Sequence, residues 1–424
     1  MEKKKRVVVV GGGFAGLNLI KRLSPIFFDV VLLDMNNFHA FPPLFYQIAS
    51  SGLDAGSVCF PFREEIRHMI NVHYSMGKLL SVNSEEHYIT TTIGEIKYDY
   101  LVIATGTVTN FFGNDNLKNH VYTLKSTTDA IELRNQILSR LELAATSVDE
   151  ELRRRYLTFV VVGGGATGVE IAGALGEMKK FILKKEYPEI DTKDVIVILA
   201  EGGCRLLSSM NTEESDKAFL YLKELGVDIC LNKSVIFYDG KTAEFNDKEK
   251  IATSTLIWTA GITGEYITGI PESSFIRGRI LTDEYNRVAE TKDIFAIGDI
   301  SYTPTKEYPK GYPQVAQPAI QQARTLACNL NGTGEWIPFR YKDKGNMATI
   351  GRNKAVVNIK GYHIHGTIAW IMWMFVHLMS LLGMKNKIIV FVNWIWNYIS
   401  YSSSLRVFIR YPNEYKNGDT KNTN

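Results

Sequence analysis

A valine-rich run that leads directly into a glycine-rich turn is the feature that most limits how this chain can fold. Val7 to Val10 form a continuous β-branched run, which is typical of a buried strand in a parallel sheet. Gly11, Gly13 and Gly16 then match the pattern G-x-G-x-x-G at the start of a helix. Such glycines allow a tight turn, a close approach to a pyrophosphate, and close packing of helix on strand. The helix N-terminus offers unpaired N–H groups to that anion.

An acidic residue at the end of the next strand distinguishes this pattern from a glycine-rich turn without a ligand. Residues 29–34 read Asp-Val-Val-Leu-Leu-Asp and predict a second strand that ends at Asp34. Asp34 follows Gly11 by 23 residues, close to the ~20 at which a carboxylate meets a ribose hydroxyl. A turn without a ligand would not require this acid, so we expect a dinucleotide-binding unit.

The same pattern returns 152 residues further along the chain, which indicates a duplicated domain. A valine-rich strand from Leu157 leads into the turn Gly163 to Gly168, and a later strand from Val195 ends in Glu201. The gap from Gly163 to Glu201 is 38 residues, longer than the usual ~20. We expect the charged stretch 179–194 to fill it with a longer helix and a loop.

The acid of the second unit bears on which dinucleotide it binds. A carboxylate at Glu201 would repel a 2′-phosphate, which favours NADH over NADPH. Arg205 lies close by in the sequence and works against that preference.

Several strand ends and one loop are further candidates for cofactor contact. Small residues end the predicted strands at 100–106, 256–261 and 293–299, where a backbone can pass close to a ligand. The loop 37–52 contains aromatic residues, two prolines and Gln47, and it could wrap a flat ring or serve ordinary loop packing.

Length, charge and cysteine content narrow the classes of protein. The 424 residues predict two or three domains of roughly 100–200 residues each. A net charge of +3 argues against nucleic acid as the main partner. Cys59, Cys204, Cys230 and Cys328 are far apart, which fits a reducing compartment and gives no metal or disulfide pattern. Only four valines follow the basic start of the chain before the first glycine, too few for an export signal.

The C-terminal region differs in composition from the rest of the chain. Residues 361–410 contain four basic residues, no acidic residue, and four of the six tryptophans. Two apolar aromatic segments, 367–383 and 388–401, are shorter than the ~20 residues of a spanning helix and have Lys385 and Lys387 between them. They favour helices that lie in the membrane interface, with tryptophans at the headgroup level. Core or dimer-interface helices and a true membrane span are the alternatives.

Residues 316–322 read Ala-Gln-Pro-Ala-Ile-Gln-Gln and open a predicted helix after the last strand. With the two glycine turns and the Ala-Thr-Gly and Gly-Asp strand ends, the sequence resembles flavoprotein pyridine-nucleotide oxidoreductases. Within that group, the 316–322 motif and the tryptophan-rich C-terminus resemble the type II, single-subunit, non-proton-pumping NADH:quinone oxidoreductases. The match runs from Arg6 to about Arg410, although Ala166 stands where many members carry proline.

The resemblance implies an α/β fold with two Rossmann-like dinucleotide-binding domains and a C-terminal helical membrane-anchoring segment. The FAD-binding domain would comprise residues 1–115 and 285–345, the NADH-binding domain 116–284, and the membrane-associating region 346–424 with its polar tail. FAD would be held by Gly11, Gly12, Gly13, Phe14, Ala15, Gly16, Asp34, Gln47, Ala104, Thr105, Gly106, Gly298, Asp299, Ala316 and Gln317. NADH would be held by Gly163, Gly165, Ala166, Thr167, Gly168, Glu201 and Gly261.

The implied activity is an NADH dehydrogenase of the respiratory chain: hydride passes from NADH to FAD, then two electrons pass to a membrane quinone. Ubiquinone and menaquinone are not distinguished, a homodimer is expected, and the location is the cytoplasmic side of the cell membrane, as a peripheral protein. Gln317 and Gln321 would line the quinone end of the flavin, or else serve helix capping and surface packing. Glu170 would contact the nicotinamide or link the two substrate sites, or else only interact with the helix N-terminus.

Four other classes of protein share parts of this pattern. A disulfide reductase or a sulfide:quinone reductase would need paired cysteines, and none of the four has an obvious partner. A ferredoxin reductase would not need the apolar C-terminal segments. A non-enzymatic flavin-binding membrane-associated protein would keep the glycine turns but turn over NADH and quinone negligibly.

Overall fold

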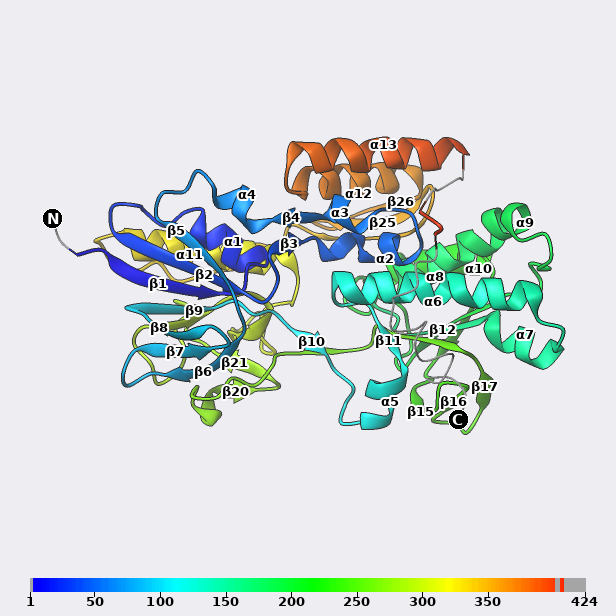
Figure 1. Ribbon diagram of the computed structural model, residues 1–424, viewed down its shortest axis with the longest axis horizontal. Coiled ribbons are helices and arrows are strands. Elements are labelled where there is room, and N and C mark those ends of the chain that lie inside the picture. Colours follow the sequence, from blue (N-terminus) through cyan, green and yellow to red (C-terminus); the bar gives the residue numbers. More distant parts are fainter. Residues whose placement is uncertain (1–2, 401–404, 408–424) are drawn as a thin grey trace. The chain divides into compact units, whose positions relative to one another are not determined.

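The structure is a computed structural model that describes residues 3–400 and 405–407 (Figure 1). The chain packs as two units. Unit 1 takes residues 1–40, 59–108 and 262–344, and unit 2 takes 41–58, 109–261 and 345–424. The polar tail after residue 407 and the end of the second aromatic segment at Tyr401 lie outside the described residues.

Unit 1 is built on a five-stranded parallel sheet in the order β22-β9-β1-β2-β5. The expected valine strand is β1 at its centre, and all of Val7 to Val10 are buried. The strand bounds are β1 (Lys5–Val10), β2 (Phe28–Asp34), β5 (Val72–Met76), β9 (Tyr100–Ile103) and β22 (Ile294–Ala296). Because all five strands run parallel, their carboxyl ends meet at one edge, where ligands bind in such sheets.

Smaller elements complete unit 1. Two helices, α1 and α11, contact each other along this unit. Their bounds are α1 (Phe14–Ile20) and α11 (Ala316–Asn331), with α4 (Phe62–Ile66) nearby on β5. The further strands are β3 (Phe38–Ala40), β4 (Cys59–Pro61), β6 (Leu79–Asn83), β7 (Tyr88–Thr91), β8 (Gly94–Lys97), β20 (Phe275–Ile276), β21 (Arg279–Leu281) and β23 (Ser301–Tyr302).

Unit 2 repeats this plan with a second five-stranded parallel sheet, in the order β11-β18-β12-β13-β14. Its central strand β12 is buried along its whole length, as the valine run predicts. The strand bounds are β11 (Tyr122–Thr123), β12 (Thr158–Val162), β13 (Ile196–Glu201), β14 (Val227–Leu231) and β18 (Thr255–Trp258). A three-stranded meander adds β15 (Val235–Tyr238), β16 (Thr242–Phe245) and β17 (Lys250–Ala252).

The helices of unit 2 include the extension that the long spacing before Glu201 predicts. Helix α8 (Ala166–Glu177) continues as a π-helical turn, Met178–Ile182, and then as α9 (Leu183–Glu186) before a loop leads to β13. The prediction of a longer helix and a loop is therefore confirmed. The other helices are α2 (Phe45–Ala49), α3 (Ala55–Val58), α5 (Asp115–His120), α6 (Thr127–Thr146), α7 (Glu150–Tyr156) and α10 (Thr212–Glu224).

The C-terminal part of unit 2 is a three-stranded antiparallel sheet followed by two helices. The elements are β24 (Asn346–Gly351), β25 (Lys354–Ile359), β26 (Tyr362–His365), α12 (Thr367–Ser380) and α13 (Met384–Ser400). Within the described part of the chain, no helix is long and apolar enough to cross a membrane.

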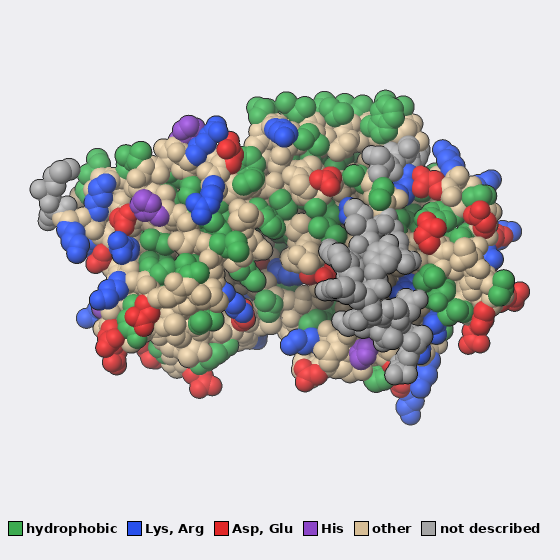
Figure 2. Space-filling view, in the orientation of Figure 1, with side chains coloured by type: hydrophobic (Ala, Val, Ile, Leu, Met, Phe, Trp, Pro, Cys, Tyr) green, Lys and Arg blue, Asp and Glu red, His purple; other side chains and the backbone are tan. Residues whose placement is uncertain are grey.

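Most of the large aliphatic side chains of helix α13 face outward, whereas a surface helix normally turns them towards the core. Its inward stripe carries Asn386, Val390 and Trp394, whereas most of its isoleucine, valine and phenylalanine side chains are exposed. Figure 2 shows hydrophobic side chains in a nearly continuous row over α12 and α13. The expectation that the tryptophans lie at a membrane surface does not hold for Trp373 and Trp394, which are 1% and 8% exposed.

Candidate functional site

The first glycine turn has the close backbone contacts that its sequence predicts. Gly11 takes a φ of +101°, and a Cβ there would meet the Ala104 carbonyl oxygen at 2.4 Å. A Cβ on Gly16 would meet the Gly11 carbonyl oxygen at 1.9 Å. Nothing lies within 4 Å of a Cβ built on Gly13, so this side of the turn is open. The outer two glycines are required by the protein itself, whereas Gly13 leaves space for a ligand.

Asp34 is held directly beneath this turn. Its carboxylate accepts the Gly12 N–H at 2.6 Å and the Asn36 N–H at 2.8 Å. Burial raises the pKa of Asp34 above its ordinary value, and these two N–H groups act in the opposite direction. The acid is therefore fixed at the carboxyl edge of the sheet, as the strand-ending position predicts.

Two helix N-termini with no side-chain cap belong to the same unit. Gly13 precedes α1 and Val315 precedes α11, and neither offers a capping side chain. Gly298, at φ +77°, lies between these helices, because a Cβ there would be 3.1 Å from Ala15 and 3.5 Å from Ala319. Unpaired N–H groups at helix N-termini attract anions, so this arrangement fits the pyrophosphate of a dinucleotide.

Gln322, which the sequence did not single out, supports that arrangement from within the core. Its side chain is 1% exposed, its Oε1 accepts the Gly298 N–H at 2.7 Å, and its Nε2 donates to Ser301 Oγ at 3.0 Å. A buried amide is normally hydrogen-bonded, and this one fixes the turn that carries Asp299. The helix begins at Ala316, as predicted, and Gln322 lies on its buried side.

The two glutamines that the sequence did single out share one face of α11 and bind one segment of backbone. Gln321 donates to the Lys342 carbonyl oxygen at 2.9 Å and accepts the Lys342 N–H at 3.0 Å. Gln317 accepts the Lys344 N–H at 3.2 Å. Both side chains thus hold residues 342–344, which corresponds to the packing alternative. A role towards quinone stays a prediction.

The second glycine turn matches the first contact for contact. Gly163 takes a φ of +109°, and a Cβ on Gly168 would meet the Gly163 carbonyl oxygen at 1.8 Å. Gly165 is open, because none of the described residues lies within 4 Å of its Cβ position. Glu201 accepts the Gly164 N–H at 2.5 Å, as Asp34 accepts that of Gly12. Gly165, Ala166 and Thr167 are exposed around an uncapped start of α8, which again fits a pyrophosphate.

The strand end at Thr259 to Gly261, beside this turn, corresponds to the strand end at Ala104 to Gly106 in unit 1. The backbone of Thr259 and Ala260 passes within 3.0 Å of the Cβ position of Gly163, as Ala104 does at Gly11. Gly261 takes a φ of +76°, and a Cβ there would meet the Phe112 ring at 2.5 Å. The resemblance between the Ala-Thr-Gly and Ala-Gly strand ends therefore extends to their geometry.

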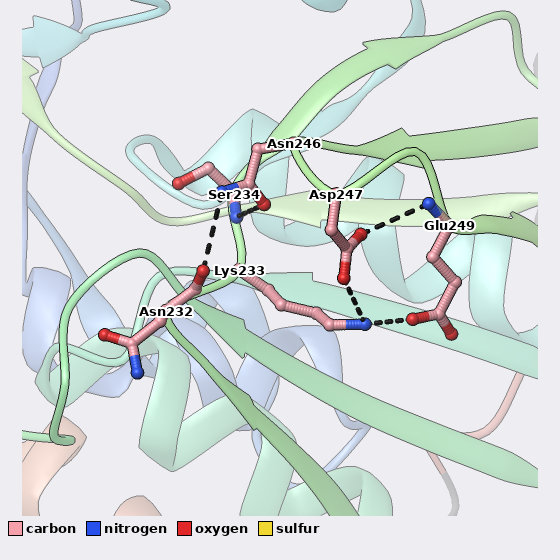
Figure 3. A network of polar contacts seen from close by, with 6 residues as sticks. All are labelled: Asn232, Lys233, Ser234, Asn246, Asp247 and Glu249. Atoms are coloured by element: carbon pink, nitrogen blue, oxygen red, sulfur yellow. Dashed lines mark hydrogen bonds and ion pairs between the residues drawn. The ribbon is translucent and has the colours of Figure 1, made fainter.

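Cations near Glu201 are already engaged by other groups. Lys233 pairs with Asp247 at 3.0 Å and also with Glu249, in the network that Figure 3 shows. Its backbone N–H donates to the Glu201 carbonyl oxygen at 2.9 Å. Arg205 donates to the Ser208 carbonyl oxygen at 2.8 Å, but its Nη1 is buried without a partner. Among the described residues, Arg205 therefore keeps one guanidinium nitrogen that makes no hydrogen bond.

Glu170 lines an open-sided cavity of about 160 Å³, and all the residues of its lining belong to unit 2. The walls come from α2, α8, β24, α12 and α13 and include Tyr46, Gln47, Glu177, Arg352, Trp370, Trp373, Trp394 and Asn397. Burial raises the pKa of Glu170 to about 8, although the Thr349 N–H donates to its carboxyl group. This raised pKa favours the protonated form of Glu170, which borders the cavity instead of interacting only with the helix N-terminus.

A second acid lies two turns along α8, on the same face as Glu170. Glu177 accepts the Arg352 N–H at 2.5 Å, and burial raises its pKa. Between the two acids, Gly173 lets β24 approach, because a Cβ there would be 1.9 Å from the Ile350 carbonyl oxygen. These three positions join α8 to the C-terminal sheet, and the two acids line the cavity.

The four cysteines are free thiols. Cys204 and Cys328 are exposed, and Cys59 and Cys230 are partly buried. The redox cysteine pair that a disulfide reductase uses is not formed by these residues.

Known proteins match the chain over almost its whole length. The pyridine nucleotide-disulphide oxidoreductase family matches residues 5–323, and the NDH2 C-terminal domain family matches residues 344–400. The type II NADH:quinone oxidoreductase Ndh of Mycobacterium tuberculosis is 33% identical over 94% of this chain and 89% of its own. An internal alternative NAD(P)H-ubiquinone oxidoreductase of Solanum tuberosum is 30% identical over 93% of this chain and 86% of its own.

Solved structures share the fold at lower identity. NDH2 from Plasmodium falciparum in complex with NADH superposes with a TM-score of 0.89 at 22% identity, covering 96% of this chain and 100% of that one. The sulfide:quinone oxidoreductase of Aquifex aeolicus gives a TM-score of 0.71 at 17% identity, covering 94% of this chain and 96% of that one. With two matched dinucleotide turns and the matching C-terminal domain, the chain belongs to the type II NADH:quinone oxidoreductase family.

Proposed function

We propose that the protein oxidises NADH and passes two electrons to a membrane quinone without pumping protons. The observation that carries this proposal is the duplicated turn, in which Asp34 accepts the Gly12 N–H and Glu201 accepts the Gly164 N–H. Ubiquinone and menaquinone both suit the proposal.

The FAD site is proposed in unit 1 and its strand ends. Gly11 to Gly16, Asp34, Ala104 to Gly106 and Gly298 to Asp299 would hold the dinucleotide, with the uncapped starts of α1 and α11 facing its pyrophosphate. When bound, FAD supplies the ability to accept a hydride and to give up two electrons, while the protein positions the reactants. Residues 1–115 and 285–345 remain the proposed FAD-binding domain.

The NADH site is proposed in residues 116–284. Gly163 to Gly168 would bind the pyrophosphate at the start of α8, Gly261 would flank it, and Glu201 would accept hydrogen bonds from the adenosine ribose. A carboxylate there disfavours a 2′-phosphate, so NADH is preferred over NADPH.

Quinone reduction also consumes two protons, and Glu170 is the proposed donor of one of them. Burial raises its pKa to about 8, which favours the protonated form, and it lines the cavity of unit 2, so it suits a general acid. Gln317 and Gln321 are proposed at the quinone end, where their hold on residues 342–344 would fix the wall of the site.

Membrane attachment is proposed through the exposed faces of α12 and α13. Ile371, Phe375, Ile388 and Phe391 are 56%, 64%, 56% and 47% exposed, and Lys385 is exposed beside them. A contiguous apolar surface flanked by cations suits the interface of an anionic bilayer. The proposed location is peripheral, on the cytoplasmic side, with residues 346–424 as the membrane-associating region and the chain as a homodimer.

Two aspartate substitutions on this face test the attachment. A double variant, Ile371→Asp with Phe391→Asp, should lose co-sedimentation with phosphatidylglycerol vesicles, because charged groups cannot enter the apolar interface. Ile70→Asp, at an 85% exposed residue of unit 1, is the matched control and should bind as wild type does. If the double variant still pelleted with vesicles but eluted as a monomer where wild type is a dimer, the face would be a dimer interface.

A chain cut near Lys360 should also lose membrane attachment, but the point variants test the attachment without changing the cavity. Trp373 and Trp394 line the cavity, so the cut would remove part of its wall as well.

The activity is tested by steady-state oxidation of NADH by the purified protein with a short-chain ubiquinone. We expect turnover with quinone and no turnover with a disulfide substrate or with a ferredoxin. Turnover with either of the latter, and none with quinone, would place the chain in a different branch of the flavoprotein oxidoreductases.

A further inference from the structure

A series of hydrogen bonds leads from helix α13 into the cavity of unit 2. The indole Nε1 of Trp394 donates to Gln47 Oε1 at 2.7 Å. The Nε2 of Gln47 donates to the hydroxyl oxygen of Tyr46, also at 2.7 Å. All three residues line the cavity that Glu170 faces.

The chemistry of these groups fixes the direction of each hydrogen bond. An indole N–H can only donate, so the amide oxygen of Gln47 must face Trp394. The amide nitrogen must then face Tyr46, whose hydroxyl oxygen accepts. The hydroxyl hydrogen of Tyr46 is left to point elsewhere, and among the described residues no acceptor is hydrogen-bonded to it.

Tyr46 keeps this hydrogen at any physiological pH. Its side chain is 9% exposed, burial raises its pKa well above the ordinary value, and Glu170 nearby acts in the same direction. A buried hydroxyl hydrogen without an acceptor is costly, so the cavity is prepared for a ligand that supplies one. The walls around it combine aromatic side chains, Trp370, Trp373 and Trp394 among them, with polar and charged ones such as Arg352 and Asn397.

We propose that Tyr46 donates a hydrogen bond to a carbonyl oxygen of the quinone headgroup in this cavity, and that Trp394 and Gln47 are positioning residues that aim it. A quinone combines a flat apolar ring, which aromatic walls accommodate, with carbonyl oxygens that only accept hydrogen bonds. The inference rests on the proposed quinone reductase activity and adds the residue that recognises the acceptor.

The first experiment removes the donor and keeps the ring. Tyr46→Phe should weaken binding of decylubiquinone to the oxidised protein, measured by calorimetry without NADH, by about threefold to tenfold, the usual effect of one neutral hydrogen bond. The KM for quinone should rise by the same factor, whereas reduction of ferricyanide by NADH should be unchanged. Unchanged quinone affinity in Tyr46→Phe would overturn the proposal.

The second experiment tests whether Trp394 acts through Tyr46. Trp394→Phe removes the N–H that orients Gln47 and keeps an aromatic wall, so it should also weaken quinone binding, by about twofold to fivefold. In the Tyr46→Phe background the same substitution should have no further effect, because the hydrogen bond it aims is already gone. Trp396→Phe is the control on the exposed side of α13, where Trp396 is 63% exposed.

The outcomes separate the two proposals. A wild-type protein that does not reduce quinone at all would refute the proposed function. Suppose instead that the wild-type protein reduces quinone, but that Trp394→Phe weakens quinone binding as much in the Tyr46→Phe background as it does alone. This result would show that Trp394 only supports packing and would overturn its positioning role.

Discussion

The two glycine turns of this protein have nearly the same geometry, but the helices that they open carry different side chains. In each turn the first glycine of the motif takes a positive φ and the third packs on the first. An acid accepts the N–H of the residue directly after the first glycine, Gly12 in unit 1 and Gly164 in unit 2. Two residues after the third glycine, unit 1 carries Asn18 and unit 2 carries Glu170. The shared part can bind a dinucleotide, and the residue that differs adds chemistry.

The local surroundings of these two residues explain the difference. Asn18 donates to the Phe14 carbonyl oxygen at 2.8 Å and accepts from Arg22 just beyond the end of α1, so its polar groups are used locally. Glu170 faces the cavity with its pKa raised to about 8. A duplicated fold has therefore kept one position structural in the first copy and made it a candidate proton donor in the second.

The largest expected effect comes from adding a methyl group to the third glycine of either turn. Gly16→Ala should yield protein without flavin, and Gly168→Ala should retain flavin but lose reduction by NADH, because each Cβ would meet a carbonyl oxygen at 1.9 or 1.8 Å. Flavin absorbance and its bleaching by NADH measure the two outcomes.

Gly13→Ala and Gly165→Ala are the matched controls, because nothing lies within 4 Å of either Cβ position. Their melting temperatures should stay close to wild type, with any loss confined to ligand binding. If Gly168→Ala also released the flavin, the division of roles between the two turns would be wrong.

The next largest effect concerns Glu170 and pH. If the protonated acid serves quinone reduction, wild-type turnover should fall as pH rises through about 8, where Glu170 loses its proton. Glu170→Gln should lose this alkaline limb and about 10²-fold in the quinone step, the lower range for a general acid. Asn18→Ala, at the equivalent position of unit 1, should change neither.

Glu170→Gln, which should lower activity, should raise stability at alkaline pH, and this gives an independent check of the pKa of Glu170. A raised folded-state pKa means that ionising Glu170 destabilises the fold as pH rises from the ordinary carboxyl range towards about 8. Glu170→Gln should therefore unfold at a higher denaturant concentration than wild type at pH 9, but not at pH 4. Equal stabilities at both pH values would indicate an ordinary, solvated carboxylate.

A smaller effect is expected at the acid that closes the second turn. Glu201→Ala should weaken NADH binding by about tenfold or more, the usual loss of hydrogen bonds to a charged group, and should reduce the preference over NADPH. Arg205→Ala should weaken NADPH further with little effect on NADH. Equal use of NADH and NADPH by the wild-type protein would contradict the role given to Glu201.

The smallest effect is expected at Gln317, whose side chain accepts the Lys344 N–H. Gln317→Ala should slow reoxidation by quinone about threefold, through one lost neutral hydrogen bond, and leave reduction by NADH unchanged. The reverse pattern, slow reduction and normal reoxidation, would place this end of α11 on the NADH side.

Features encoded within one short stretch were predictable from the sequence. The strands β1, β2, β12 and β13, both glycine turns and both acids are where their spacing predicts, because each depends on contacts made within one strand–turn–helix unit. The extension of α8 was also predictable, from the excess length before Glu201.

Features that depend on distant contacts were not predictable. The bond between Trp394 and Gln47 joins residues 347 positions apart, and no periodicity connects them. The choice between Gln321 and Gln322 as the buried glutamine depends on which face of α11 packs on the turn at Gly298 and Ser301. In the sequence, the tryptophans of α12 and α13 have the composition and flanking lysines of residues at a membrane interface. Two of them, Trp373 and Trp394, are instead buried by packing within unit 2, which the sequence does not reveal.

The central claim, that one turn serves the flavin and the other serves NADH on the way to quinone, is tested most directly by anaerobic sequential mixing. The purified protein is mixed with NADH and then with a short-chain ubiquinone while flavin absorbance is followed. We predict stoichiometric bleaching by NADH and full recovery on addition of quinone. Absence of bleaching with NADH, or bleaching that quinone does not reverse, would contradict the account.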